Sequence, residues 1–309
     1  MSIITTNADS STESVIATLS YVRRFAGSTV LIKLGGAALQ ESDLVDSICE
    51  DLMLIRSVGV SVVLVHGGGP SINQELTSRG ISWEFIDGQR VTTPEMMNVI
   101  EMVLCGSVNR RIVRTLNHAG VKAVGMSGTD ASTLYCKKAS AKLGQVGQID
   151  KVNTTFIKSI LNTQSDGIGT IPVIAPVGVG KNGEAFNINA DWAAARIAQA
   201  LEIDKVLFLT DQHGILDDSG QLIPELDAGE LENLIETGVV KGGMHAKVTT
   251  ILHALRHGVN DVHILNARRP HGLIEELFTD RGVGTVCRLR SRAQGTSSSA
   301  SKEVAHAQV

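Results

Sequence analysis

The stretch "SVVLVHGGGPSINQEL" at residues 61–76 decides how this chain is read. Its mostly apolar first half predicts a buried strand, and His66 and three consecutive glycines follow at the turn out of that strand. Two chemistries need such a bare backbone. One is the oxyanion hole that an HGGG loop forms in lipases and esterases. The other is a phosphate cradle, in which free N–H groups at a strand-to-helix turn surround an anion.

The composition sets the broad class of protein. The 309 residues predict about two domains, and with 43% hydrophobic and 19% charged residues the chain can bury a large core. The formal net charge is -4, which gives no general attraction to nucleic acid or to an anionic membrane. Only 3% of the residues are aromatic, which disfavours base-stacking platforms. We therefore expect neither a nucleic-acid partner nor a membrane partner.

Cysteine usage and the chain's first residues indicate a cytoplasmic protein. The cysteines have no CxxC spacing, so we expect no metal site and no disulfide framework, but free buried thiols in a reducing compartment. No apolar run approaches the ~18 residues of a membrane span. The opening "MSIITTNADSSTESV" has no apolar core, so we expect no signal peptide there. The four cysteines are Cys49, Cys105, Cys136 and Cys287.

Strand-like and helix-like patterns alternate along most of the chain. This alternation predicts an α/β fold, a mainly parallel open sheet with helices on both faces. The expected strands are residues 29–34, 61–66, 121–126, 171–177, 205–210 and 261–266. The expected helices between them are residues 41–59, 93–120, 189–202 and 242–258.

The two ends of the chain differ from this pattern. Residues 12–26 predict an amphipathic helix, and the polar, Ser/Ala-rich end predicts a disordered tail. We therefore divide the chain into an extension (1–26), two lobes (27–188 and 189–289) and a tail (290–309).

The esterase interpretation lacks its nucleophile. It needs a G-x-S-x-G turn, and the nearest match, "GMSGTD", has Thr129 at the last glycine position. The common nucleotide motifs are also missing. Walker A is absent, and "GVGKNG" at 178–183 spells G-x-G-x-x-G without opening a helix. Its Asn182-Gly183 pair instead predicts a hairpin turn.

A second glycine pair favours phosphate. "IKLGG" places Lys33 near the end of the first strand, with Gly35 and Gly36 directly after it. Parallel strands bring their carboxyl ends to one edge of the sheet, where open α/β sheets bind ligands. Phosphoryl transfer requires mainly alignment and positive charge at such a place. Taken alone, Lys33 is equally well a lysine that extends from a strand end to water.

Two further segments carry polar residues of interest. "FNINADWAAARIAQAL" offers Asn189 as an N-cap and Asp191 in the first helical turn, but it leaves Asn187 without a structural reason. "VKGGMHAKVTTIL" supplies another glycine pair and a second lysine, Lys247. A solvated surface lysine is the ordinary interpretation of that residue by itself.

Together these segments resemble the amino acid kinase family, and within it the members that phosphorylate N-acetyl-L-glutamate. The likeness covers about residues 18–287, with the family's motifs in the family's order. The motifs are "YVRRFAGSTVLIKLGG", "VVLVHGGGPSIN", "GQRVTTPEMM", "GQID", "IPVIAPVGVGKNGEAFNINAD", "LTDQHGIL", "KGGMHAK" and "HGLIEELFTDRGVGT".

The resemblance implies transfer of the γ-phosphoryl group of ATP to the side-chain carboxylate of N-acetyl-L-glutamate, a step of arginine biosynthesis. Lys33 and Lys247 match the family's lysines that neutralise the moving phosphoryl group, and Asp191 matches the acid that holds both. The lobe at 27–188 would bind acetylglutamate and form the dimer contact, and the lobe at 189–289 would bind ATP. Mg²⁺ would bridge the ATP phosphates, with no ligand expected from the protein.

Other site residues follow from the same motifs. A carboxylate acceptor is already a nucleophile at neutral pH, so no general base is needed, and the planar fork of Arg90 suits a carboxylate. The matching substrate-binding residues are Gly36, Gly67, Gly68, Arg90 and Asn187. The matching ATP-binding residues are Gly35, Thr210, Asp211 and Gly243.

The resemblance extends to regulation. The helix ending in "YVRRFAG" is similar to the extension of hexameric, arginine-inhibited members, and His263, Glu276 and Gly282 fall where those members hold arginine. It implies a homodimer or a hexamer built as a trimer of dimers, and arginine as an effector. Read without the resemblance, His263 is a core histidine on a strand and Glu276 a solvated glutamate. Docking of a nitrogen-signalling regulator stays open.

Three positions depart from the family pattern, and several alternative functions remain. Gln89 replaces an apolar residue, and Thr129 and Ala131 replace a lysine and a glycine. None of these removes a charged position expected in catalysis. The alternatives are a related kinase for another carboxylate, for carbamate or for a nucleotide, a non-catalytic arginine sensor, and the esterase.

Overall fold

The computed structural model describes residues 16, 19–20, 22–23, 25–36, 38–163, 169–279 and 282–290. Much of the predicted helix at 12–26 and nearly all of the predicted tail at 290–309 lie outside these residues. The described residues from 16 to 25 are helical.

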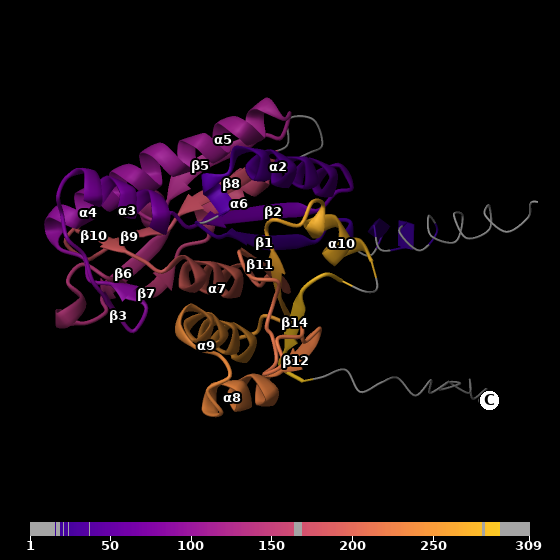
Figure 1. Cartoon of the computed structure of the whole chain (residues 1–309). Coiled ribbons are helices and arrows are strands. Elements are labelled where there is room, and N and C mark those ends of the chain that lie inside the picture. Colours follow the sequence, from indigo (N-terminus) through magenta and orange to yellow (C-terminus); the bar gives the residue numbers. More distant parts are fainter. Residues whose placement is uncertain are drawn as a thin grey trace, which may run out of the picture.

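The main sheet confirms the predicted fold class (Figure 1). Every neighbouring pair in it is parallel except β13 and β14, which are antiparallel. The eight strands, in spatial order, are β12 (Glu225–Asp227), β14 (Thr285–Arg288), β13 (Asp261–Asn266), β11 (Lys205–Thr210), β1 (Thr29–Leu34), β2 (Ser61–His66), β8 (Ile171–Ala175) and β5 (Ala123–Ser127).

Helices cover both faces of this sheet and bury two apolar cores (Figure 1). The first face carries α2 (Ser42–Ser57), α3 (Gly69–Ser78), α4 (Pro94–Glu101), a π-helix η2 (Met102–Val108), α5 (Asn109–His118) and α10 (Gly272–Phe278). The second face carries α6 (Thr155–Leu161), α7 (Ala190–Leu201), α8 (Ala228–Glu236) and α9 (Gly242–Arg256). Three short 3₁₀ segments, η1 (Ala38–Gln40), η3 (Asp130–Ser132) and η4 (Ala141–Leu143), lie in the connections.

Strand periodicity decides which way Lys33 faces. In β1, Val30, Ile32 and Leu34 belong to the first core, whereas Leu31 belongs to the second. Side chains two residues apart share one face of a strand. Lys33 therefore shares the face of Leu31, which is the face covered by α7 and α9.

The structure also contains elements that the sequence did not reveal. A four-stranded sheet has the order β10 (Ala185–Asn187), β9 (Val177–Val179), β6 (Leu134–Lys138) and β7 (Gly147–Val152). A separate hairpin joins β3 (Phe85–Ile86) to β4 (Gln89–Arg90).

Two predicted elements need correction. The single strand at 171–177 is wrong, because Pro176 separates β8 in the main sheet from β9 in the smaller sheet. Proline has no N–H to continue a ladder, so a chain changes sheets there readily. The predicted helix at 93–120 is not uniformly α-helical, because η2 interrupts it.

Two local predictions are confirmed. The Asn182-Gly183 turn joins the antiparallel strands β9 and β10, with Gly183 at φ +82°. The side chain of Asn189 accepts hydrogen bonds from the main-chain N–H groups of Asp191 and Trp192, so it caps α7.

Candidate active site

The two glycine loops meet at the carboxyl ends of β1 and β2, as their positions in the sequence predicted. The Gly35 N–H donates to the Leu209 carbonyl (2.8 Å), and the Gly67 N–H donates to the Leu34 carbonyl (2.9 Å). A Cβ atom on Gly36 would lie 3.1 Å from the Gly68 nitrogen and 3.0 Å from the Gly69 nitrogen. Any side chain at Gly36 would crowd these amides, which open helix α3.

Three charged side chains converge beside these loops, and we call them the lysine cluster. Lys33 Nζ lies 2.7 Å from Asp191 Oδ1, and Lys247 Nζ lies 2.7 Å from Asp191 Oδ2. They come from β1, α7 and α9, which are far apart in sequence. The side chains of both lysines are 10% exposed, and that of Asp191 is 15% exposed.

The electrostatics of the lysine cluster leave a positive charge at the site. Burial disfavours the charged carboxylate, but the two ammonium groups outweigh burial and hold the pKa of Asp191 well below its usual range. Burial, and then repulsion from Lys33, lowers the pKa of Lys247, while Asp191 opposes that shift. One carboxylate facing two ammonium groups keeps net positive charge where an incoming phosphoryl group would add negative charge.

A cavity of about 180 Å³ adjoins the second glycine loop. Its lining includes Gly67, Gly68, Arg90 and Asn187, so the structure brings together four of the five predicted substrate-binding residues. The fifth, Gly36, lies against the Gly68 and Gly69 amides. Arg90 is buried, yet its Nη1 has no hydrogen-bond partner within the described parts of the chain. A buried guanidinium with an unused donor suits a carboxylate ligand.

Residues that the sequence did not single out hold Arg90 and Asn187 in place. Arg90 Nη2 donates to the side-chain oxygen of Asn73, and its guanidinium lies 4.7 Å from the Phe85 ring centroid. Thr92 is fully buried; its hydroxyl donates to the Arg90 carbonyl (2.9 Å) and accepts from Asn187 Nδ2 (3.1 Å). Asn187, for which the sequence gave no structural reason, is thus tied to the segment that carries Arg90. Only the motif "GQRVTT" hinted at Thr92.

The residues predicted to bind ATP lie near the same edge of the sheet. Thr210 is the last residue of β11, and its hydroxyl donates to Asp211 Oδ1 (3.1 Å). Gly243 is the second residue of α9, the helix that carries Lys247. The register of β1 against β11 pairs Leu34 with Leu209, so Gly35 lies level with Thr210.

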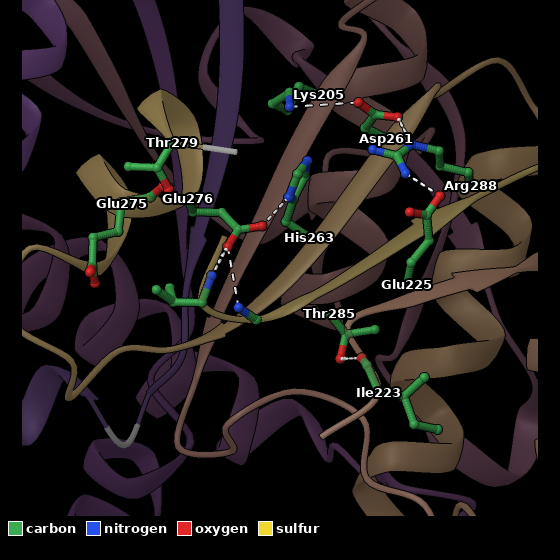
Figure 2. A network of polar contacts seen from close by, with 12 residues as sticks. Lys205, Ile223, Glu225, Asp261, His263, Glu275, Glu276, Thr279, Thr285 and Arg288 are labelled. Carbon is green, nitrogen blue, oxygen red and sulfur yellow. Dashed lines mark hydrogen bonds and ion pairs between the residues drawn. The ribbon is translucent and has the colours of Figure 1, made fainter. Parts of the chain in front are cut away.

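His263 and Glu276 meet at a second site, and we call them the histidine cluster (Figure 2). His263 Nδ1 contacts Glu276 Oε1. Glu276 Oε2 also accepts from the main-chain N–H groups of Val283 (2.7 Å) and Gly284 (3.2 Å). Gly282 adjoins this carboxylate at φ +51°, so the three residues predicted to hold arginine are neighbours.

The sequence predicted no metal site, no membrane span and no disulfide framework. Among the residues that the structure describes, no group of three His, Cys, Asp or Glu side chains is placed to hold a metal ion. Within the same residues, no helix has the length and apolarity needed to cross a membrane. All four cysteines are free; Cys49, Cys136 and Cys287 are buried, whereas Cys105, which was also expected to be buried, is half-buried.

The fold is that of the phosphotransferases of the amino acid kinase family. The amino acid kinase family matches residues 28–266, and the chain belongs to this family. The resemblance inferred from the motifs is therefore confirmed.

Individual relatives narrow the comparison. The chain is 44% identical over 277 residues to the acetylglutamate kinase of Geobacter metallireducens, covering 87% of this chain and 95% of that protein. It is 41% identical over 275 residues to the acetylglutamate kinase of Campylobacter hominis, covering 89% and 95%. Among solved structures, it matches N-acetylglutamate synthase from Neisseria gonorrhoeae with a TM-score of 0.79 and 24% identity. That match covers 91% of this chain and 64% of the synthase, and it supports the fold alone.

Proposed function

We propose that this protein phosphorylates the side-chain carboxylate of N-acetyl-L-glutamate with ATP. The observation that carries the proposal is the convergence of Lys33 and Lys247 on Asp191 beside two glycine loops. The similarity to acetylglutamate kinases across nearly their whole length supports the choice of acceptor.

The reaction follows from this arrangement. A carboxylate oxygen of the acceptor attacks the γ-phosphorus of ATP, the bond from that phosphorus to its bridging oxygen breaks, and ADP leaves. Lys33 and Lys247 face the phosphoryl oxygens from opposite sides, and the N–H groups of Gly36 and Gly68 donate to them. The Asp191 carboxylate contacts one ammonium group with each of its oxygens and so holds both lysine side chains in position. Arg90 and Asn187 hold the α-carboxylate and the surroundings of the acceptor.

Mg²⁺ fits this site as a partner of ATP rather than of the protein. Each Asp191 oxygen already faces a lysine, and in the described chain no group of three His, Cys, Asp or Glu side chains is placed to hold a metal ion. Bound to the ATP phosphates, the ion would supply charge neutralisation, which needs few protein ligands.

Regulation and assembly complete the proposal. His263, Glu276 and Gly282 would bind arginine as a feedback inhibitor, and the extension at 1–26 would join homodimers into a hexamer. The division into an acceptor lobe at 27–188 and an ATP lobe at 189–289 belongs to the same proposal, as does a cytoplasmic location.

The decisive experiment measures ADP release from ATP with N-acetyl-L-glutamate, with and without arginine. Glutamate, carbamate and a nucleoside monophosphate serve as competing acceptors in parallel reactions. We expect N-acetyl-L-glutamate to give the highest kcat/KM. A higher kcat/KM for any competing acceptor would replace the proposed substrate, and ester hydrolysis without ATP would replace the reaction.

A further inference from the structure

The chemistry proposed above leaves one residue of the opening motif unused. His66 is the last residue of β2 and comes directly before the three glycines. It is fully buried. It shares the strand face of Val62 and Leu64, which pack in the first core, so its ring is on the side of the sheet that α5 covers.

The hydrogen bonds of His66 define its protonation. His66 Nε2 lies 3.1 Å from Asn109 Nδ2, and His66 Nδ1 lies 2.9 Å from the Gly67 carbonyl oxygen. The Asn109 Nδ2 group also donates to the Val173 carbonyl (2.9 Å), which identifies it as the amide nitrogen. His66 Nε2 therefore accepts, and Nδ1 carries the proton and donates to Gly67. Burial lowers the pKa of His66 to about 4, which keeps this neutral form at neutral pH.

The π-helix before α5 contacts the same loop. A Cβ atom on Gly68 would lie 2.5 Å from Leu104 Cδ2 and 3.6 Å from Val108 Cγ2, and both residues belong to η2. Asn109 follows η2 as the first residue of α5. One interrupted helix thus supplies the apolar contact beneath Gly68 and the polar partner of His66. Short π-helices are frequent at functional sites.

We propose that His66 is a positioning residue for the phosphate-binding loop, acting through the Gly67 carbonyl that its Nδ1–H holds. In a trans peptide the C=O and N–H groups point in opposite directions. Holding the Gly67 oxygen toward the sheet interior turns the Gly68 N–H toward Gly36, and the Gly68 nitrogen does lie beside that residue. This inference rests on the proposed function, because the Gly68 N–H is assigned there to the moving phosphoryl group.

Two substitutions of His66 separate its two hydrogen bonds. The amide nitrogen of asparagine is as many bonds from Cβ as imidazole Nδ1, so His66→Asn can still donate to the Gly67 carbonyl. The amide group of glutamine lies as many bonds from Cβ as imidazole Nε2. His66→Gln can therefore still contact Asn109, but it loses the hydrogen bond to the Gly67 carbonyl. We expect kcat in His66→Gln to fall about 10- to 100-fold with little change in KM for N-acetyl-L-glutamate. We expect His66→Asn to retain at least about five times the kcat of His66→Gln.

The control separates positioning from stability. Asn109→Ala removes the partner of Nε2. Asn117→Ala, at the other end of the same helix, removes three side-chain hydrogen bonds to the main chain of Val113 and Ala123. We expect both variants to lower Tm, but only Asn109→Ala to lower kcat per folded enzyme. Amide hydrogen exchange of the peptide containing Gly67 and Gly68 should be faster in His66→Gln and in Asn109→Ala than in the wild type.

The outcomes are distinguishable. Equal kcat in His66→Asn and His66→Gln, or unchanged exchange at Gly67 and Gly68 in His66→Gln, would overturn the positioning role. Absence of ADP release by the wild type with N-acetyl-L-glutamate would overturn the proposed function instead, and the exchange comparison would still test whether His66 orders the loop.

Discussion

The lysine cluster and the histidine cluster both bury an acid between other polar groups, but they are built differently. Asp191 is held by the tips of two long side chains from β1 and α9. Glu276 is held by one imidazole and by two main-chain N–H groups, those of Val283 and Gly284 (Figure 2). The first arrangement keeps an excess of positive charge on movable groups. The second matches one carboxylate to donors that are fixed by the backbone.

This difference indicates what each cluster is suited to do. Lysine ammonium groups can leave a carboxylate for a phosphoryl group and return to it without refolding the chain. The donors around Glu276 cannot leave without moving the turn at Gly282–Gly284 or strand β13. The lysine cluster is therefore suited to turnover, and the histidine cluster to holding α10 against β13 unless a ligand replaces its contacts.

The largest expected effect is on turnover, from removing either lysine. Lys33→Ala or Lys247→Ala should lower kcat by about 10²- to 10³-fold, because each removes a charge that faces the phosphoryl group in the transition state. Steady-state ADP release gives the value. Lys137→Ala is the matched control, since Lys137 forms an exposed pair with Asp150. Near-normal turnover in either cluster variant would remove the lysine cluster from the mechanism.

A second prediction concerns stability rather than rate. Asp191→Asn leaves two buried ammonium groups facing each other without a counter-charge. Removing one partner from a buried ionic group costs about 3–5 kcal/mol, so the free energy of unfolding should fall by roughly that amount. Urea unfolding at neutral pH measures the loss. Asp150→Asn, at the exposed pair, should change it by less than about 1 kcal/mol. Similar losses in the two variants would mean that the lysine cluster is solvated in solution.

The lysine cluster was predicted only in part from the sequence. Glycine turns after apolar strands predicted where β1 and β2 end. The face on which Lys33 lies, that of α7 and α9, was not predicted and comes from the structure. Nothing local indicated that Lys247, 56 residues after Asp191, would reach it; the family motifs implied that, and the structure now provides the distance. Long-range pairing of this kind depends on how helices pack, which single-sequence patterns do not encode.

Other parts of the site escaped prediction for a related reason. Thr92 and Asn109 are buried polar residues whose partners lie 95 and 43 positions away in the chain, in Asn187 and His66. A threonine before a helix and an asparagine inside one resemble ordinary cap and surface residues. The π-helix η2 keeps the helical apolar pattern on both sides, so the sequence predicted one uninterrupted helix.

The third prediction tests the histidine cluster directly. Glu276→Gln keeps the size of the side chain but removes its charge and one of its acceptor oxygens. We expect a loss of about 1–3 kcal/mol in the free energy of unfolding and loss of inhibition by arginine. Turnover without arginine should change far less than in the lysine variants. Inhibition that survives unchanged would place arginine binding elsewhere, and a large fall in basal turnover would contradict the division of roles.

The smallest expected effect separates the two clusters by pH. Burial lowers the pKa of His263 below its ordinary value, so the unfolded chain binds more protons just below pH ~6.5. Stability should therefore fall as the pH drops from 7 to 5, and His263→Gln should remove about 1 kcal/mol of that fall. The depressed pKa of Asp191 gives stability that is present above pH ~4 and is lost only below it. The pKa of Glu276 is also lowered. Burial disfavours its charged form, but the hydrogen bonds from His263, Val283 and Gly284 outweigh this effect. Burial also lowers the pKa values of His66 and His253 to about 4, so these two histidines contribute to the same fall. The difference between the wild type and His263→Gln in urea unfolding from pH 7 to pH 5 therefore isolates the histidine cluster, and His118→Gln, on the exposed end of α5, is the control. If Asp191→Asn, and not His263→Gln, reduced the fall in the free energy of unfolding between pH 7 and pH 5, Asp191 would be the group that titrates in this range, and the assignment to His263 would be wrong.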